Sequence, residues 1–258
     1  LHYARHSFPT RRSSDLGELL TTYGYELKGG EKKLTCENYY TGKEITIPLD
    51  ETKSAVDNAK KYFDKYAKLK RTFEALNIQI AETKEEIEHL ESISNSLDIA
   101  RQDSDLTAIK HELSDCGYIK KHHEKNKGSK NTGKSKPLHY ISSDGFDMFV
   151  GKNNYQNDEL TFKVATGNDW WFHAKASAGS HVIVKTEGKE LPDRTFEEAA
   201  RLAAHYSKAC EQDKAEIDYI QKKHIKKPNG SKPGFVVYYT NYSMTISTDI
   251  TGIQEVTE

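Results

Sequence analysis

The thirteen residues DWWFHAKASAGSH, at positions 169–181, decide the predicted architecture of the second half of the chain. They predict a strand that ends near His173, a tight turn at Ala178 and Gly179, and a second strand that starts at His181. Two tryptophans, a phenylalanine and two histidines fall within this strand-turn-strand segment. The segment therefore carries part of a predicted sheet and a concentration of side chains that could bind a ligand.

Short strands on both sides of this segment predict an α+β domain over residues 138–250. The expected strands lie near residues 138–142, 146–150, 169–173, 181–185, 216–220, 235–239 and 243–247. The main helix is expected to start at Thr195, the predicted N-cap of a capping box with Glu198. A shorter helical turn is expected over residues 155–160. The alanines of the main helix allow it to approach a sheet closely.

Residues 54–97 predict one long helix with a seam of apolar residues. The seam positions recur at alternating steps of four and three, which is the 3.5-residue period of a coiled coil. They are Tyr62, Tyr66, Leu69, Phe73, Leu76, Ile80, Thr83, Ile87 and Leu90. An ordinary amphipathic helix on a globular core is the alternative. The pattern persists over about four heptads, which favours the coiled coil.

The expected partner helix lies upstream, in an antiparallel arrangement. No equally long helix follows the arm, whereas residues 17–27 are expected to form the last turns of a preceding helix. Residues 33–49 predict a β-hairpin, because apolar residues alternate on both sides of a Thr41-Gly42 turn. The hairpin would stand at the tip of an antiparallel coiled-coil arm that extends over residues 17–118.

Two segments differ in composition from the rest of the chain. Residues 1–16 are basic and aperiodic and resemble a translated sequencing-library adapter, so they are expected to be non-native, with the native chain continuing upstream. Residues 119–137 are predicted to be a basic linker, because residues 120–136 contain seven lysines and no large apolar residue. Composition leaves open whether this linker contacts phosphates or only keeps the chain in solution.

The bulk composition excludes several classes of protein. The formal net charge is −1, so any nucleic-acid interface must be local. Cys36, Cys116 and Cys210 lie far apart and form no CxxC pair, which fits a reducing cytoplasm. No apolar run approaches the ~20 residues that a membrane span requires. These features favour a cytoplasmic protein, and no cofactor is expected.

An amide-rich turn, VGKNNYQNDEL at residues 150–160, follows one of the expected strands. Asparagine and glutamine side chains both donate and accept hydrogen bonds. A cluster of them at a strand-to-helix turn either caps the helix or binds an external polar partner. The candidate RNA-contacting residues in this turn are Lys152, Asn153, Asn154, Gln156 and Asn157.

The histidines of the strand-turn-strand segment raise the question of metal binding or catalysis. A zinc site needs three or four ligands, and no cysteine lies near His173 and His181. Ser180 and His181 are neighbours whose side chains would point to opposite faces of a strand, so this histidine cannot act as the base for that serine. A surface for stacking and phosphate binding remains, with His173, Lys175, Ser180 and His181 as candidates. In the alternative, a tryptophan lies in the core and both histidines are structural.

A lysine-rich loop, QKKHIKKPNGSKPG at residues 221–234, contains five lysines and no acidic residue. Such a loop after a strand is a candidate electrostatic footprint for RNA, with Lys222, Lys223, Lys226 and Lys227 as the contacts. A mobile, solvated loop is the alternative.

These motifs, in this order, resemble the NFACT (RqcH/NEMF) family of ribosome quality-control factors, whose bacterial members are also described as fibronectin-binding proteins. The second half resembles the family's NFACT-R domain through DGFDMFVGKNNYQNDELTFKVA, DWWFHAK, GSHV, EEAARLAAHYSKA and KKHIKKPNGSKPG. The arm resembles the coiled-coil middle region through GELLTTYGYELKGG, VDNAKKYFDKYAKLKRT and TKEEIEHLE. Lys152 stands where the family usually has arginine.

The resemblance implies a binding protein without a catalytic site of its own. Family members bind the obstructed large ribosomal subunit with its peptidyl-tRNA, recruit alanyl-tRNA and support alanine tailing of the stalled chain, while peptide transfer belongs to the ribosome. The arm would reach a ribosomal stalk-base protein, and NFACT-R would contact RNA. The alternative, from the older description of the family, is a cell-surface adhesin that binds fibronectin.

Overall fold

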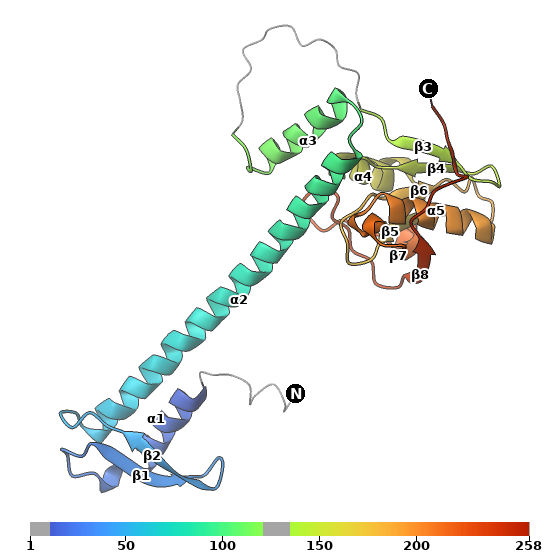
Figure 1. Cartoon of the computed structure of the whole chain (residues 1–258). Coiled ribbons are helices and arrows are strands. Elements are labelled where there is room, and N and C mark those ends of the chain that lie inside the picture. Colours follow the sequence, from blue (N-terminus) through green and yellow to red (C-terminus); the bar gives the residue numbers. More distant parts are fainter. Residues whose placement is uncertain (1–10, 121–134, 258) are drawn as a thin grey trace. The chain divides into compact units, whose positions relative to one another are not determined.

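The structure is a computed structural model that describes residues 11–120 and 135–257. It consists of two compact units, and the division between Lys84 and Glu85 lies within the long helix α2, Ala55–Ile99 (Figure 1). This helix begins and ends within two residues of the expected bounds, 54–97. The α+β class and the single long helix are therefore confirmed.

In the first unit, a β-hairpin connects helix α1 to helix α2. The elements are α1 (Arg11–Tyr23), the short turn η2 (Gly24–Glu26), β1 (Lys33–Asn38) and β2 (Lys43–Pro48). The antiparallel register pairs Leu34 with Ile47 and Cys36 with Ile45, which confirms the hairpin predicted over residues 33–49. Leu34 and Ile47 are buried, because alternate residues of the hairpin face the helices.

Helix α1 runs antiparallel to the first turns of α2. A Cβ atom on Gly17 would come within 2.9 Å of the Phe63 ring, and one on Gly24 would come within 3.0 Å of Ala55. The chain thus moves forward from Gly17 in α1 to Gly24 at the start of η2 while its neighbours move backward along α2, from Phe63 to Ala55. Both helices and the hairpin share one core, which is Leu19, Leu20, Leu34, Ile47 and Ala59. Helix α1 also includes residues 11–16, which their composition set apart from the rest of the chain.

Helix α2 is exposed over several turns beyond this core. Every side chain from residue 67 to residue 88 is exposed, and these include the seam positions Leu76, Ile80 and Ile87. An apolar seam of this length is typical of a helix that packs on another helix. The antiparallel contact with α1 agrees with the expected arrangement, and a longer coiled-coil partner stays a prediction.

The second unit contains a seven-stranded antiparallel sheet in the order β8-β7-β5-β6-β4-β3-β9. Its strands are β3 (Leu138–Ile141), β4 (Asp147–Val150), β5 (Trp170–Ala174), β6 (Val182–Val184), β7 (Lys214–Gln221), β8 (Tyr242–Ser247) and β9 (Gln254–Glu255). The strand expected near residues 235–239 is wrong. That stretch makes only an isolated bridge between Val237 and Lys226, because Val236 and Tyr238 pack over the sheet instead.

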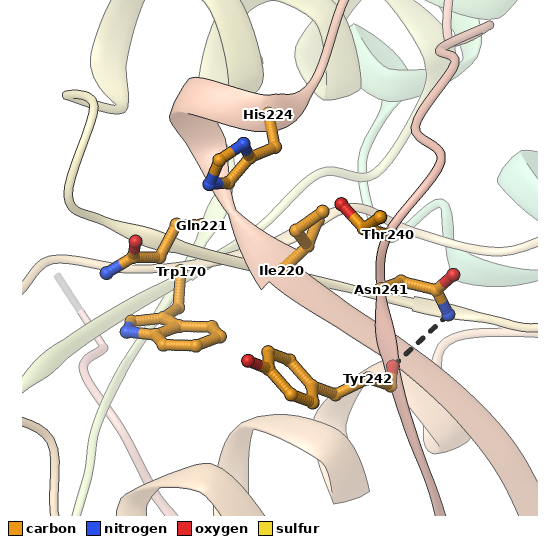
Figure 2. Close-up of a pocket in the computed structure, with 7 residues that line it drawn as sticks. All are labelled: Trp170, Ile220, Gln221, His224, Thr240, Asn241 and Tyr242. Atoms are coloured by element: carbon orange, nitrogen blue, oxygen red, sulfur yellow. Dashed lines mark hydrogen bonds between the residues drawn. The ribbon is translucent and has the colours of Figure 1, made fainter.

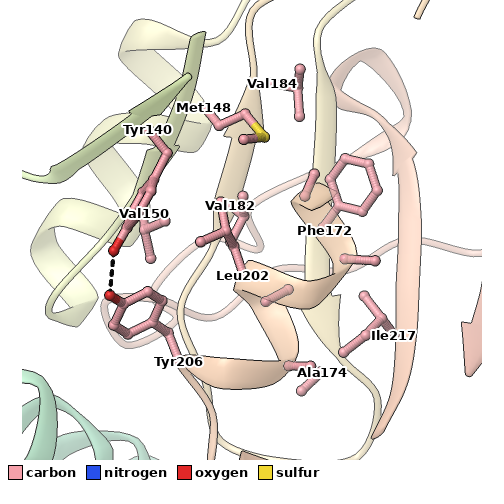
Figure 3. Close-up of a cluster of buried hydrophobic side chains, with 14 of the residues drawn as sticks. Tyr140, Met148, Val150, Phe172, Ala174, Val182, Val184, Leu202, Tyr206 and Ile217 are labelled. Atoms are coloured by element: carbon pink, nitrogen blue, oxygen red, sulfur yellow. Dashed lines mark hydrogen bonds between the residues drawn. The ribbon is translucent and has the colours of Figure 1, made fainter. Parts of the chain in front are cut away.

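Helices cover both faces of this sheet. Helix α5 (Asp193–His205) lies on one face, where its alanines pack with Phe172 and Val182 in the larger core (Figure 3). Helix α4 (Asn154–Glu159) and the π-helical turn η3 (Leu160–Val164) precede β5, and Leu160 packs on the other face with Trp171 and Ile183. Trp171 and Phe172 thus point to opposite faces of the sheet, because side chains alternate along a strand.

Two local predictions about turns are wrong. The N-cap of α5 is Pro192, not Thr195. Thr195 is buried and donates to Asp144 at 2.8 Å, and Glu198 accepts from the Ser143 backbone N–H at 2.8 Å. These side chains therefore hold the turn between β3 and β4 instead of capping the helix.

The turn after β5 comes earlier than expected. It lies at Lys175 and Ala176, and Ala176 adopts a φ of 49°. Gly179 instead forms a bridge with Ser207, and a Cβ atom there would come within 2.8 Å of the Ser207 side chain.

The second unit begins before the boundary assigned from sequence. It includes the last turns of α2 and helix α3 (Asp103–Asp115), both of which the sequence placed in the arm region at residues 17–118. The short turns η4 (Lys208–Glu211) and η5 (Lys222–His224) complete it. Most of the predicted basic linker, residues 121–134, lies outside the described residues. Among the helices that the structure describes, none combines the length and the apolar composition of a membrane span.

The exposed seam generates a prediction for an isolated arm peptide, residues 54–97. We expect it either to be poorly helical when dilute or to self-associate, because the peptide lacks the packing that α1 and the sheet domain give its two ends. Circular dichroism and sedimentation over a range of concentrations test this. A fully helical, monodisperse monomer would contradict it.

Candidate nucleic-acid interface

The amide-rich turn forms hydrogen bonds inside the protein. Asn153 caps helix α4, since its side-chain oxygen accepts from the Gln156 backbone N–H at 3.0 Å. The Gln156 side chain in turn accepts from the Lys152 N–H at 2.9 Å. A Cβ atom on Gly151 would come within 2.2 Å of the Asn157 side chain, so only glycine fits there. The capping interpretation of this turn is thus confirmed for Asn153.

Asn154 connects this turn to helices α2 and α3. Its amide donates at 2.7 Å to Glu112 of α3 and at 2.7 Å to Ser92 of α2. The same Glu112 oxygen lies 3.0 Å from Nε2 of His89, one turn earlier in α2. Asn154, Glu112 and His89 are all buried. The amide side chain therefore binds the end of the long helix instead of an external partner.

Lys152 forms a buried ion pair with helix α3. Its Nζ atom lies 2.6 Å from Oδ1 of Asp105, and both side chains are almost fully buried. Burial alone would raise the pKa of Asp105, but hydrogen bonds from Lys152, Ser135 and the Arg101 backbone N–H lower the pKa below its ordinary value. The carboxylate stays charged, and Lys152 is not available to a phosphate.

His181 and Asn157 form a second internal group behind β6. The His181 backbone N–H donates to Asn157 at 3.0 Å, and the ring nitrogen Nδ1 lies 2.8 Å from the Thr161 hydroxyl. Burial, the main cause, holds the pKa of His181 well below its ordinary value. Ser180 is also buried, and its hydroxyl has no partner among the described residues. Its hydroxyl makes no hydrogen bond to His181, whose Nδ1 faces Thr161 and Asn157, so the two side chains form no catalytic pair.

His173 belongs to the aromatic layer around Trp171. The two rings stack with centroids 5.5 Å apart, and the ring of His181 lies edge-on at 5.5 Å. Burial lowers the pKa of His173 to about 4. Both histidines are therefore neutral at physiological pH and structural, as in the alternative interpretation.

The lysine-rich loop remains at the surface. Lys223, Lys226 and Lys227 are exposed, whereas Lys222 is half-buried. The Nζ atoms of Lys222 and Lys227 lie about 6 Å over the Phe162 ring. Lys226 exchanges backbone hydrogen bonds of 3.0 and 2.9 Å with Val237. These contacts hold the base of the loop in place.

The exposed candidate lysines fall into two groups, those with an acidic partner among the described residues and those without one. Lys227 pairs with Asp158, and Lys175 pairs with Glu216 at 2.6 Å. Lys223 and Lys226 make no ion pair with any residue that the structure describes. They are the exposed lysines of the loop without such a pair, so they are available to an external anion.

The thirteen candidate residues do not form one surface. Buried inside the second unit are Lys152, Asn153, Asn154, Gln156, Asn157, Ser180 and His181. Only the lysine-rich loop and Lys175 offer exposed cations. The sequence identified polar side chains correctly, but it could not show that the end of α2 and helix α3 would be their partners.

The sequence interpretation missed a surface cleft at the edge of the sheet (Figure 2). Its volume is about 480 Å³, and its lining residues are Trp170, Ile220, Gln221, His224, Thr240, Asn241 and Tyr242. The aromatic run FVVYYTNY at residues 235–242 was the available signal. Its alternation instead predicts a strand near residues 235–239 and a short connection to the next strand.

The structure also bears on the question of a metal centre. In residues 11–120 and 135–257, no group of three or more histidine, cysteine, aspartate or glutamate side chains is placed to hold a metal ion.

The buried ion pair gives a prediction for stability. Asp105→Ala should lower the free energy of unfolding by about 3–5 kcal/mol, because it leaves the Lys152 charge buried without a partner. The double variant Asp105→Ala with Lys152→Met should recover part of this loss. Urea unfolding followed by tryptophan fluorescence measures both. Asp103→Ala, an exposed residue in the same helical turn, is the control, and an equal loss in this control would contradict the prediction.

The neutral His173 gives a prediction for pH dependence. The pKa of His173 falls from 6.5 in the unfolded chain to about 4 in the fold, so only the unfolded chain takes up this proton between those values. Stability should therefore fall as the pH drops from 6.5 to 4, by about 3 kcal/mol from this group. His173→Gln should flatten the profile in urea unfolding between pH 7.5 and 4.5. An unchanged slope would show that His173 does not titrate as inferred.

Comparison with known proteins places these features in one family. The model of the NFACT N-terminal and middle domains matches residues 10–132, and the model of the NFACT protein RNA binding domain matches residues 136–239. The Rqc2 homolog RqcH of Streptococcus suis is 43% identical over 86% of this chain and 39% of its own length. That of Bacillus subtilis is 38% identical over 90% of this chain and 41% of its own length. The chain thus spans about two fifths of the length of these relatives.

A solved structure shows the same fold. The C-terminal part of the fibronectin/fibrinogen-binding protein from Streptococcus suis aligns with a TM-score of 0.67 and 34% sequence identity. The alignment covers 92% of this chain and 83% of that one. Both family models match in the order of the two units, and the sequence identity extends over most of the chain. The chain belongs to the NFACT (RqcH/NEMF) family and includes its RNA-binding domain.

Proposed function

We propose that this chain is the RNA-binding and ribosome-binding part of a cytoplasmic ribosome quality-control factor. The whole protein would bind an obstructed large ribosomal subunit that carries peptidyl-tRNA, recruit alanyl-tRNA and support alanine tailing of the stalled chain. The match to the NFACT RNA-binding domain over residues 136–239 is the observation that carries this proposal. The names of the relatives, Rqc2 homologs, support it.

The exposed lysines supply the chemistry for such binding. Lys223 and Lys226 are exposed and make no ion pair among the described residues, and the contacts of Lys226 with Val237 fix the loop. A fixed loop holds its cations near the phosphates at a smaller entropic cost than a freely moving one. Phosphate contacts of this kind give affinity without reading sequence.

The part played by this chain would be binding alone. Peptide transfer would belong to the ribosome, and we assign no catalytic residue. The exposed seam of α2 would serve the arm's contact with a ribosomal stalk-base protein. Its apolar residues Leu76, Ile80 and Ile87 and the charged residues between them are exposed, which suits a helix that engages other surfaces.

One observation favours a second candidate. The solved structure with the same fold is described as part of a fibronectin/fibrinogen-binding protein. Surface capture of fibronectin by this chain tests that function directly. Binding to large ribosomal subunits without measurable binding to fibronectin would favour the ribosomal function.

The lysine-rich loop gives the decisive prediction. Replacement of Lys222, Lys223, Lys226 and Lys227 by alanine should weaken binding to purified large subunits and to tRNA. Each lost phosphate contact should reduce the slope of log affinity against log salt by about one, so the total change should be roughly two to four. The direct measurement is co-sedimentation or filter binding at several salt concentrations.

A matched variant controls for net charge. Lys110, Lys189, Lys208 and Lys214 are exposed and lie outside the loop. Their replacement by alanine removes the same number of charges and should leave the salt slope near that of the parent. If both variants weaken binding equally, the loop has no special part in it.

A further inference from the structure

The cleft beside the lysine-rich loop has the size and the lining of a ligand site. Its volume of about 480 Å³ lies within the range of about 300–1,000 Å³ that is usual for small-molecule sites. The ends of β5, β7 and β8 meet there, so Trp170, Ile220 and Tyr242 come from three adjacent strands of the sheet (Figure 2). A site on such strands is held more rigidly than one made of loops alone.

Two aromatic rings form one side of the cleft. Tyr242 is exposed and stacks on Tyr219, with the ring centroids 5.5 Å apart and an interplanar angle of 28°. Trp170 is half-buried and rests edge-on against Phe196 at 4.8 Å. The Trp170 and Tyr242 centroids are 6.4 Å apart and the planes meet at 46°. The two rings already contact each other, so a flat ligand stacks on their outer faces and not between them.

Polar side chains surround these rings. In the view of Figure 2, Gln221 and His224 are drawn higher than the Trp170 ring. Thr240 and Asn241 are drawn to the right of it. The amides of Gln221 and Asn241 both donate and accept hydrogen bonds, which suits the edge of a nucleobase. The Asn241 amide lies 3.3 Å from the Tyr242 carbonyl oxygen, which orients it.

The backbone fixes two lysines next to this lining. Between Gln221 and His224, the N–H of Lys222 donates to Asp169 at 2.9 Å and that of Lys223 donates to Gly167 at 3.1 Å. Lys223 is thus held beside the cleft by the backbone, whereas the Nζ atom of Lys222 lies about 6 Å over the Phe162 ring. A ligand that carries a flat ring and a phosphate would find both of its binding groups here.

We propose that this cleft binds one base of a single-stranded RNA segment, stacked on the exposed ring of Tyr242 with Trp170 at its edge, and with an adjoining phosphate toward Lys223. This inference rests on the proposed RNA-binding function and adds a site to it. The lysines would give affinity through charge, and the aromatic cleft would require that a base be unpaired. The module would then favour single strands over an intact duplex.

The test compares two neighbouring tyrosines in the full chain. Tyr242→Ala should weaken binding of a single-stranded hexanucleotide by about fivefold or more. It should leave unchanged the binding of an abasic strand with the same number of phosphates. Tyr239→Ala should bind both strands as the parent does, because Tyr239 is 84% exposed and lies outside the lining. Circular dichroism verifies that each variant is folded.

Tryptophan fluorescence gives an independent measurement on the parent protein. The chain has two tryptophans, and Trp171 is fully buried while Trp170 lines the cleft. The intact hexanucleotide should quench Trp170, and the abasic strand should not.

The outcomes separate this site from the proposed function. Equal binding of the hexanucleotide by Tyr242→Ala and the parent, with the salt dependence of the lysine-rich loop intact, overturns the base site alone. Absence of salt-dependent RNA binding in the parent overturns both. Equal quenching of Trp170 by intact and abasic strands also rejects base stacking.

Discussion

The buried polar contacts of one strand-to-helix turn hold the second unit together. Lys152 reaches Asp105 in α3, and Asn154 reaches Glu112 in α3 and Ser92 in α2. Buried charges and amides are strongly unfavourable unless each has a partner, so these residues constrain the positions of both helices on the sheet. The end of the long helix is thereby tied to the sheet domain by specific pairs, where apolar contacts alone would permit sliding.

This arrangement also distributes the charge of the domain. The lysine and amides of the turn are used internally, and burial keeps neutral the two histidines that contact Trp171, His173 and His181. Exposed cations therefore remain concentrated in the lysine-rich loop, beside the aromatic cleft. A small domain in a chain of formal net charge −1 can in this way present a local basic surface.

The sequence predicted the secondary-structure elements better than it predicted the hydrogen-bond partners of individual side chains. Periodicity located the hairpin, the long helix and six of the seven strands of the sheet, β3 to β8, because alternation and helical spacing are local properties. It failed where a local rule competed with a distant contact. Thr195 and Glu198 have the spacing of a capping box but bond to the turn between β3 and β4. Nothing near Asn154 in the sequence indicates that Glu112 will lie 2.7 Å away.

The cleft is a second feature that local sequence patterns do not reveal. Trp170 and Tyr242 are far apart in the sequence, and only the pairing of β7 with both β5 and β8 brings them together. The resemblance to a family supplied the function that local patterns left open, but it gave no indication of how these two rings are placed.

The pairs that join Lys152 and Asn154 to α3 have a consequence for where the RNA-binding module starts. The family model begins at residue 136, yet the ion pair and the amide contacts cross from residues 85–118 to the sheet. A protein cut before residue 136 would leave a lysine and an asparagine facing empty space that water must fill. The compact unit is therefore the sheet together with the last turns of α2 and helix α3, and excision at the homology boundary would divide it.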